Sequence, residues 1–120
     1  MTLNRVLLYA KDVALTVRFY ERYFGFEATR EDGDRIVELV HPQGGARLMI
    51  HQAAKGQRQG QVLVKLVFDV EDVQSFCDRC RADGLAFGAV HHADGYVFAN
   101  AKDPCLNTIS VSSRAFRGRA

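Results

Sequence analysis

The sequence repeats one pattern of elements twice, and this repeat limits what the chain can fold into more than any other feature. Asp12-Val13 and Asp72-Val73 lie 60 residues apart, and each pair follows an apolar run rich in β-forming residues. A glycine precedes an apolar residue at 25–26 and again at 84–85. Two copies are too few for a solenoid. We therefore expect two similar modules, each made of a strand, a helix and three further strands.

The first module is predicted to begin with a strand over residues 4–10. Asp12 follows as the N-cap of a helix, because its carboxylate can accept hydrogen bonds from the first-turn N–H groups. Apolar side chains recur at helical spacing from Val13 to Phe24. Gly25 then offers the left-handed conformation that often ends a helix. Turn-forming sequences separate three further short strands, near 26–30, 35–40 and 46–51.

The second module repeats this order with a strand over residues 62–70, a helix capped by Asp72 and a stop at Gly84. Its other strands are expected near 86–91, 96–101 and 107–112. The predicted fold class is α+β: two tandem βαβββ modules whose curved mixed sheets surround a cavity. We assign residues 1–120 to one domain. Its parts are module 1 at about 4–51, a linker at 52–60, module 2 at about 61–113 and a basic, frayed tail at 114–120.

The composition is that of an ordinary globular domain, with 48% hydrophobic and 25% charged residues among 120. The formal net charge of +2 is too small to predict nucleic acid as a partner. No signal peptide is expected, because Lys11 and Asp12 end the first apolar run. No run approaches the roughly 18 apolar residues of a membrane span. We therefore expect a cytoplasmic protein with no membrane partner.

The three cysteines form an odd set, which argues against a disulfide framework. Cys77 and Cys80 have the CxxC spacing but fall on the apolar stripe of the second helix. We interpret them as core residues rather than as a redox pair or half of a zinc site. Cys105 is expected to be an exposed thiol in a turn. The histidines near turns are expected to be solvated, namely His41, His91 and His92.

The order of elements and three local strings resemble the vicinal oxygen chelate superfamily, which includes glyoxalase I, bleomycin-binding proteins and extradiol dioxygenases. The strings are VLLYAKDV at 6–13, FYxxxxGF from Phe19 and DPxxN from Asp103. The resemblance covers residues 4 to about 113. It implies a homodimer, with a pocket between paired modules. It also implies that enzymes of the family hold one divalent metal with four inward-facing side chains from the first and last strands of each module.

Carried over by distance from these strings, the four metal positions fall on Arg5, Met49, Lys65 and Ser110. This is not a set of metal ligands. The guanidinium of Arg5 has no lone pair to donate, and Lys65 is usually protonated. The resemblance therefore implies the fold without the metal, and we predict no metal, no other cofactor and no assigned catalytic residue.

The same positions suggest a pocket that binds a small molecule. Arg5 and Lys65 are expected to attract an anion, although both could instead be exposed or paired with Glu38 or Asp69. The aromatic residues of the set could equally be core. The predicted pocket residues are Arg5, Tyr9, Met49, His51, Lys65, Phe98, Asn100 and Ser110.

Three functions remain open from the sequence. The first is a dimeric protein that binds a neutral or anionic small molecule without a metal. The second is a metal-dependent lyase, isomerase or dioxygenase that uses His51 and Asp69 in a degenerate site. The third is an interaction module with a vestigial pocket.

Overall fold

The computed structural model describes residues 1–118 and consists of two compact units. The first contains Met1–Gln61 together with Pro104–Leu106. The second contains Val62–Asp103 and the chain from Asn107 onward. Among the described residues, no helix is long and apolar enough to cross a membrane.

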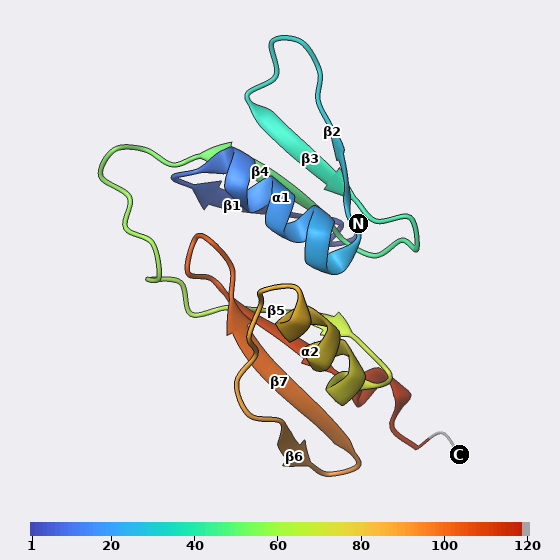
Figure 1. Cartoon of the computed structure of the whole chain (residues 1–120). Helices are drawn as coiled ribbons and strands as arrows, with labels where there is room; N and C mark the ends of the chain where they lie inside the picture. Colours follow the sequence, from blue (N-terminus) through green and yellow to red (C-terminus); the bar gives the residue numbers. More distant parts are fainter. Residues whose placement is uncertain (119–120) are drawn as a thin grey trace. The chain divides into compact units, whose positions relative to one another are not determined.

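The first unit is a four-stranded mixed sheet with one helix (Figure 1). Its elements are β1 (Arg5–Ala10), α1 (Val13–Phe24), β2 (Glu27–Thr29), β3 (Ile36–Val40) and β4 (Arg47–Gln52). The strand order is β1-β4-β3-β2, and only β1 and β4 run parallel. Alternate residues along β1 and β4 are buried in the core with the apolar side of α1, including Leu8, Ala10, Leu48 and Ile50.

The second unit has the same architecture. Its elements are β5 (Lys65–Asp69), α2 (Val73–Ala82), β6 (His91–Ala93), β7 (Tyr96–Lys102), β8 (Thr108–Ser112) and a 3-10 turn at Arg114–Phe116. The strand order β5-β8-β7-β6, with β5 parallel to β8, repeats that of the first unit. The predicted α+β class and the two βαβββ modules are therefore confirmed. The cavity between the sheets stays a prediction.

Both helices begin at the predicted aspartates. The Asp12 carboxylate accepts a hydrogen bond from the Leu15 N–H at 3.0 Å, and the Asp72 carboxylate accepts from the Ser75 N–H at 3.0 Å. Gly25 ends α1 in the left-handed region with φ of 76°. These local signals were sufficient because each cap involves only residues within one or two helical turns.

His41 is hydrogen-bonded to the end of α1. The prediction that its side chain is simply solvated in a turn is therefore wrong. Its Nδ1 accepts a hydrogen bond from the Gln43 N–H at 3.1 Å, so the proton of the neutral ring lies on Nε2. The Nε2–H donates to the Phe24 carbonyl oxygen at 2.7 Å, and the ring packs edge-on against Phe26. His41 thereby satisfies a carbonyl that the helix end leaves open.

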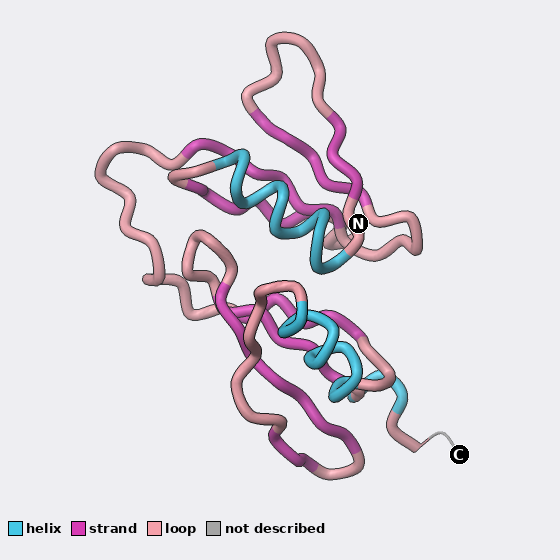
Figure 2. The backbone as a smooth tube through the Cα atoms, viewed as in Figure 1, coloured by secondary structure: helices cyan, strands magenta, loops and turns pink. Residues whose placement is uncertain are grey.

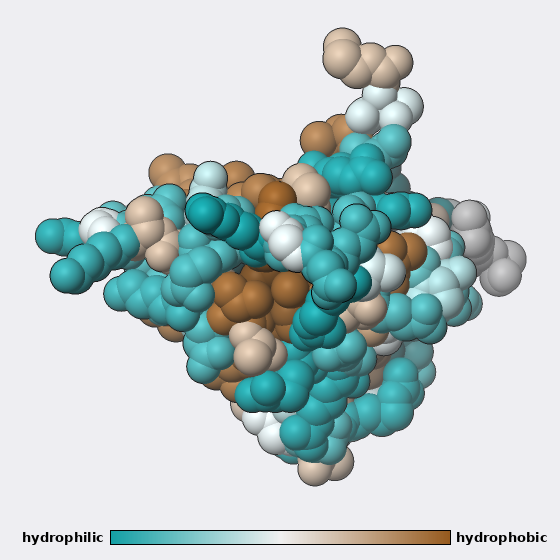
Figure 3. Space-filling view, turned by 90° about the horizontal axis from the view of Figure 1, so that it is seen from above, coloured by the Kyte–Doolittle hydropathy of each residue, from teal (hydrophilic) through white to brown (hydrophobic). Residues whose placement is uncertain are grey.

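The second module differs from its prediction at two strands. Residues 86–90 form a loop, and the strand there is only His91–Ala93 (Figure 2). His91 and His92 are exposed but lie in this strand rather than in a turn. Within the predicted strand 62–70, only Lys65–Asp69 forms ladder bonds, because the partner strand β8 begins at Thr108 opposite Lys65. Val62, Leu63 and Val64 are left exposed, among other apolar side chains on the surface (Figure 3).

Cys105 is buried, with 2% of its surface exposed, so the predicted exposed thiol is wrong. Its Sγ lies 3.2 Å from the Thr16 Oγ1, 89 residues away in sequence. Because the Thr16 hydroxyl already donates to the Asp12 carbonyl oxygen at 2.8 Å, the Cys105 thiol is the donor to Thr16. Cys77 and Cys80 are buried on α2 as predicted, and no disulfide forms among the three cysteines.

Asp72 makes the stability of the fold depend on pH. Its hydrogen bonds from the Ser75 N–H and hydroxyl lower the pKa of the carboxyl below its ordinary value of 3.8. A lowered folded-state pKa stabilises the fold above the unfolded-state value, and this contribution is lost as the pH falls through the folded-state pKa. Asp72→Asn keeps a capping oxygen without the charge. We expect the melting temperature of wild type to exceed that of Asp72→Asn at pH 7, and the difference to shrink as the pH is lowered through the folded-state pKa of Asp72. A constant difference across this range would contradict the assignment.

Leu106 is a non-glycine residue in the left-handed region, with φ of 64° and half of its surface exposed. A branched side chain is strained there. Leu106→Gly should therefore increase the free energy of unfolding by about 1 kcal/mol, measured by urea denaturation. Leu63→Gly is the matched control, because Leu63 is fully exposed without a left-handed φ. A loss of stability in Leu106→Gly as large as in the control would show that no strain is relieved.

Candidate functional site

Each sheet has one face covered by its helix and a second face that its helix does not cover, here called the open face. Side chains alternate across a strand, so the residues on each open face follow from the strand pairing. The eight predicted pocket residues all lie on the open faces, four on each. Arg5, Tyr9, Met49 and His51 belong to the first unit, and Lys65, Phe98, Asn100 and Ser110 to the second.

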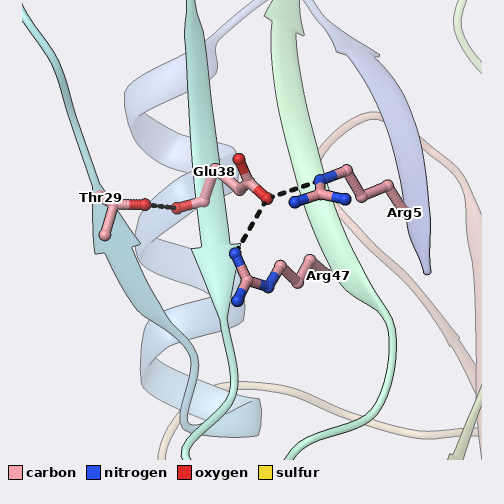
Figure 4. Close-up of polar contacts among 4 residues, drawn as sticks. All are labelled: Arg5, Thr29, Glu38 and Arg47. Atoms are coloured by element: carbon pink, nitrogen blue, oxygen red, sulfur yellow. Dashed lines mark hydrogen bonds and ion pairs between the residues drawn. The ribbon is translucent and has the colours of Figure 1, made fainter.

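The first open face carries a charged triad across three strands. Glu38 Oε1 on β3 accepts a hydrogen bond from Arg5 Nε on β1 at 2.9 Å and lies 3.5 Å from Arg47 Nη1 on β4 (Figure 4). The Glu38 carbonyl oxygen also accepts from the Thr29 hydroxyl at 3.0 Å. Of the alternatives left open for Arg5, the structure therefore shows the ion pair with Glu38. Two guanidinium groups share one carboxylate, which leaves the triad with a net positive charge.

Arg47 is a member of this site that sequence reasoning missed. It stands two residues before Met49, on the same side of β4, so strand alternation alone could have included it. Its proximity to Arg5 depends on the parallel register of β1 and β4, in which Arg5 is paired with Arg47. A single sequence does not reveal that register.

His51 and Tyr9 are neighbours in the same sheet. They are paired across β1 and β4, and their ring centroids lie 5.8 Å apart in an edge-on arrangement. The His51 Nδ1–H donates to the Gln52 carbonyl oxygen at 2.8 Å. This bond puts the ring proton on Nδ1 and leaves Nε2 with an available lone pair. Within residues 1–118, no hydrogen bond to Nε2 is found.

The second open face is more aromatic and carries its own cations. The Lys65 Nζ lies 5.2 Å from the centroid of the Phe98 ring, and His91 stacks against the same ring at 5.1 Å. His91 was not predicted for the site, because its place opposite Phe98 follows only from the β6–β7 register. The Lys102 ammonium donates to the Thr108 hydroxyl at 2.7 Å.

Ser110 and Asn100 lie opposite each other on the two central strands of the second sheet. Ser110 is 3% exposed. The Asn100 Oδ1 is buried and has no hydrogen-bond partner among the described residues. The neighbouring Ser112 differs, because its Oγ accepts from the Arg114 N–H at 3.1 Å.

The four positions carried over as metal sites occupy equivalent places in the two units. Met49 lies two residues beyond Arg47, the partner of Arg5, and Ser110 lies two residues beyond Thr108, the partner of Lys65. Two cations, a thioether and a hydroxyl do not fit a divalent metal, which prefers imidazole, thiolate or carboxylate. Among residues 1–118, no three His, Cys, Asp or Glu side chains gather in a group able to hold one.

Cys77 and Cys80 do not form a reactive pair. Burial in the α2 core raises the pKa of both thiols above the ordinary value, so they are protonated at neutral pH. The thiolate is the reactive form of cysteine, and a raised pKa therefore argues for a packing role.

Solved structures share this fold. TnmS3, an antibiotic-binding protein from Streptomyces sp. CB03234, has a TM-score of 0.77 and 17% identity, with 92% of this chain and 93% of that chain covered. Lactoylglutathione lyase from Agrobacterium tumefaciens has a TM-score of 0.72 and 22% identity, with 92% of each chain covered. An integron cassette protein from the mobile metagenome of the Halifax Harbour sewage outfall has a TM-score of 0.78 and 17% identity, with 93% and 97% covered. At these identities the likeness shows the fold alone.

No curated protein matches the chain. The family model described as Glyoxalase/Bleomycin resistance protein/Dioxygenase superfamily matches residues 2–111, and the chain therefore belongs to this superfamily.

Proposed function

We propose that this protein binds a small organic molecule, neutral or anionic, and does so without a divalent metal. One observation carries the proposal. The four positions that the family resemblance assigns to the metal are Arg5, Met49, Lys65 and Ser110, and they occupy equivalent places in the two modules. The fold is kept, while two of the four positions carry cations that repel a divalent metal.

The make-up of the open faces supports this function. Half-buried or exposed apolar side chains such as Tyr9, Val67 and Phe98 stand beside a few polar groups, which is the usual lining of a small-molecule site. The charges favour an anionic or neutral ligand over a cationic one. On the second open face Lys65 and Lys102 outnumber Asp69, whereas on the first open face Arg5 and Arg47 are matched by Glu38 and Glu27.

A homodimer in the cytoplasm is part of the proposal. Outer strands of each sheet, including β1 and β5, present unpaired backbone groups on one side, and such edges favour association. The exposed apolar run Val62–Val64 directly precedes β5 and adds apolar surface that an interface would cover. The three buried cysteines without a disulfide suit a reducing compartment.

A metal-dependent enzyme is the second candidate, and the geometry of His51 favours it. A histidine that ligates a metal through Nε2 commonly donates its Nδ1–H to a carbonyl, as His51 does to Gln52. Against it, Arg5 and Met49 supply no metal ligand, and the carboxylate of Glu38 on the same open face is already paired with Arg5 and Arg47.

Native mass spectrometry of the protein as purified, with elemental analysis of the same sample, separates the two candidates. We expect a dimer without metal. We also expect no rise in melting temperature when nickel, zinc or iron is added, since a bound metal would stabilise the folded state. One divalent metal per chain would overturn the proposal and favour the enzyme.

A thermal-shift screen tests the binding function itself, with metabolites and with antibiotics, the latter chosen because TnmS3 is an antibiotic-binding protein. At least one compound should raise the melting temperature of wild type. For an anionic hit, Arg5→Ala and Lys65→Ala should each weaken binding about tenfold or more. Arg18→Ala and Lys55→Ala are matched controls on exposed positions of α1 and the linker. If the control variants weaken binding as much as Arg5→Ala and Lys65→Ala do, the ligand does not bind at the open faces as proposed.

A further inference from the structure

The second open face contains one polar atom that the chain itself does not satisfy. The Asn100 Oδ1 is buried, and no donor reaches it from any described residue. The backbone carbonyl oxygen of Asn100 does have a partner, because it accepts from the Gly88 N–H at 2.9 Å. Buried side-chain oxygens without a partner are rare in native proteins, and each one needs an explanation such as a bound water or ligand.

Ser110 gives a second, independent observation at the same place. It lies directly opposite Asn100 on the adjacent strand and is 3% exposed. Within residues 1–118, its hydroxyl makes no hydrogen bond, yet it is not one of the buried polar atoms without a partner, so its oxygen keeps some access to solvent. An accessible hydroxyl therefore lies across the strands from the buried Asn100 Oδ1. Ser112, two residues along the same strand, is just as buried but accepts from the Arg114 N–H.

The surroundings of this pair are those of a subsite for a planar group. Phe98 lies two residues from Asn100 on the same face of β7 and provides a ring for stacking. Val67, paired with Ser110 on the other side, leaves 57% of its surface exposed. The pair is therefore bordered by aromatic and aliphatic surface that remains open in part.

The carboxamide of Asn100 selects the chemistry of its partner. It offers one acceptor and one donor group side by side, and a group of the form –NH–C(=O)– complements both at once. A carboxylate accepts only, so it would leave the buried oxygen without a donor. The hydroxyl of Ser110 can donate or accept and can complete either arrangement.

We propose that Asn100 and Ser110 form a subsite for the amide or lactam edge of a planar ligand that stacks on Phe98. The inference rests on the proposed small-molecule function and names the class of ligand. The subsite recognises a neutral edge, while Lys65 beside the Phe98 ring accommodates a negative substituent elsewhere on the ligand.

The first test needs no ligand. Asn100→Leu replaces the unsatisfied amide by an apolar group of similar size, and removing a buried group without a partner is neutral or stabilising. The melting temperature of Asn100→Leu should equal or exceed that of wild type. Asn4→Leu is the matched control at an exposed position of the first unit. A fall of several degrees in Asn100→Leu alone would mean that Asn100 has a structural partner, and the subsite would be withdrawn.

The second test uses three bicyclic probes of similar size, titrated against wild type and followed by the NMR signals of the side-chain amide of Asn100, which are absent in Asn100→Leu. They are isoquinolin-1(2H)-one, its N-methyl derivative and 1-naphthoate. The lactam should shift these signals and bind at least about tenfold more tightly than the N-methyl derivative, which has no donor for the buried oxygen. Asn100→Leu and Ser110→Ala should each weaken lactam binding, and Asn4→Leu should not.

The outcomes distinguish a failure of the subsite from a failure of the proposed small-molecule function. If compounds from the screen bind but Asn100→Leu binds the lactam as well as wild type, the oxygen holds only water and the subsite is wrong, while the function stands. Tighter binding of 1-naphthoate than of the lactam would also reject the amide edge. If no compound in the screen or probe set binds wild type, both the proposed function and the subsite fail.

Discussion

Each unit uses one helix to cover one face of a four-stranded sheet, and the rest of the structure depends on this one-sided burial. The alternation of side chains sends Leu8, Leu48 and Ile50 into the core with α1 and leaves the other face without a cover from its own helix. That second face cannot be purely apolar, since it would then expose a large hydrophobic patch. Its mixture of aromatic, charged and hydroxyl side chains is the consequence, and the proposed binding function rests on this mixture.

The charged triad on the first open face orients its arginine side chains more than it stabilises the fold. The side chains of Arg5 and Glu38 are 49% and 28% exposed. Ion pairs this accessible contribute little to folding, about 1 kcal/mol or less. Glu38 does separate the positive charges of Arg5 and Arg47 and holds both side chains over the sheet. The remaining positive charge is available to a ligand, and a divalent metal would meet repulsion at this place.

The sequence predicted what depends on neighbours in the chain and missed what depends on distant partners. The caps at Asp12 and Asp72 and the stop at Gly25 are local, so the residue types were enough. The eight residues predicted for the pocket lie on the open faces because alternation and the repeat fix the face of each strand. The burial of Cys105 depends on Thr16, which is 89 residues away, and no local rule contains that contact. The positions of Arg47 and His91 likewise depend on strand register, which the spacing of residues within one strand does not determine.

The serines of β8 show why the unsatisfied oxygen of Asn100 on the second open face is informative. Ser110 and Ser112 are both buried on the same side of one strand, so burial alone does not distinguish them. Ser112 is satisfied by the Arg114 N–H at the start of the 3-10 turn that follows. Ser110 and Asn100 lie in the middle of two central strands, where every backbone donor is directed within the ladder and not toward the face. A side chain on that face can be satisfied only by another side chain or by a molecule from outside. Ser110, which is paired with Asn100 across the strands, makes no hydrogen bond to it, so a molecule from outside the chain is the simpler explanation.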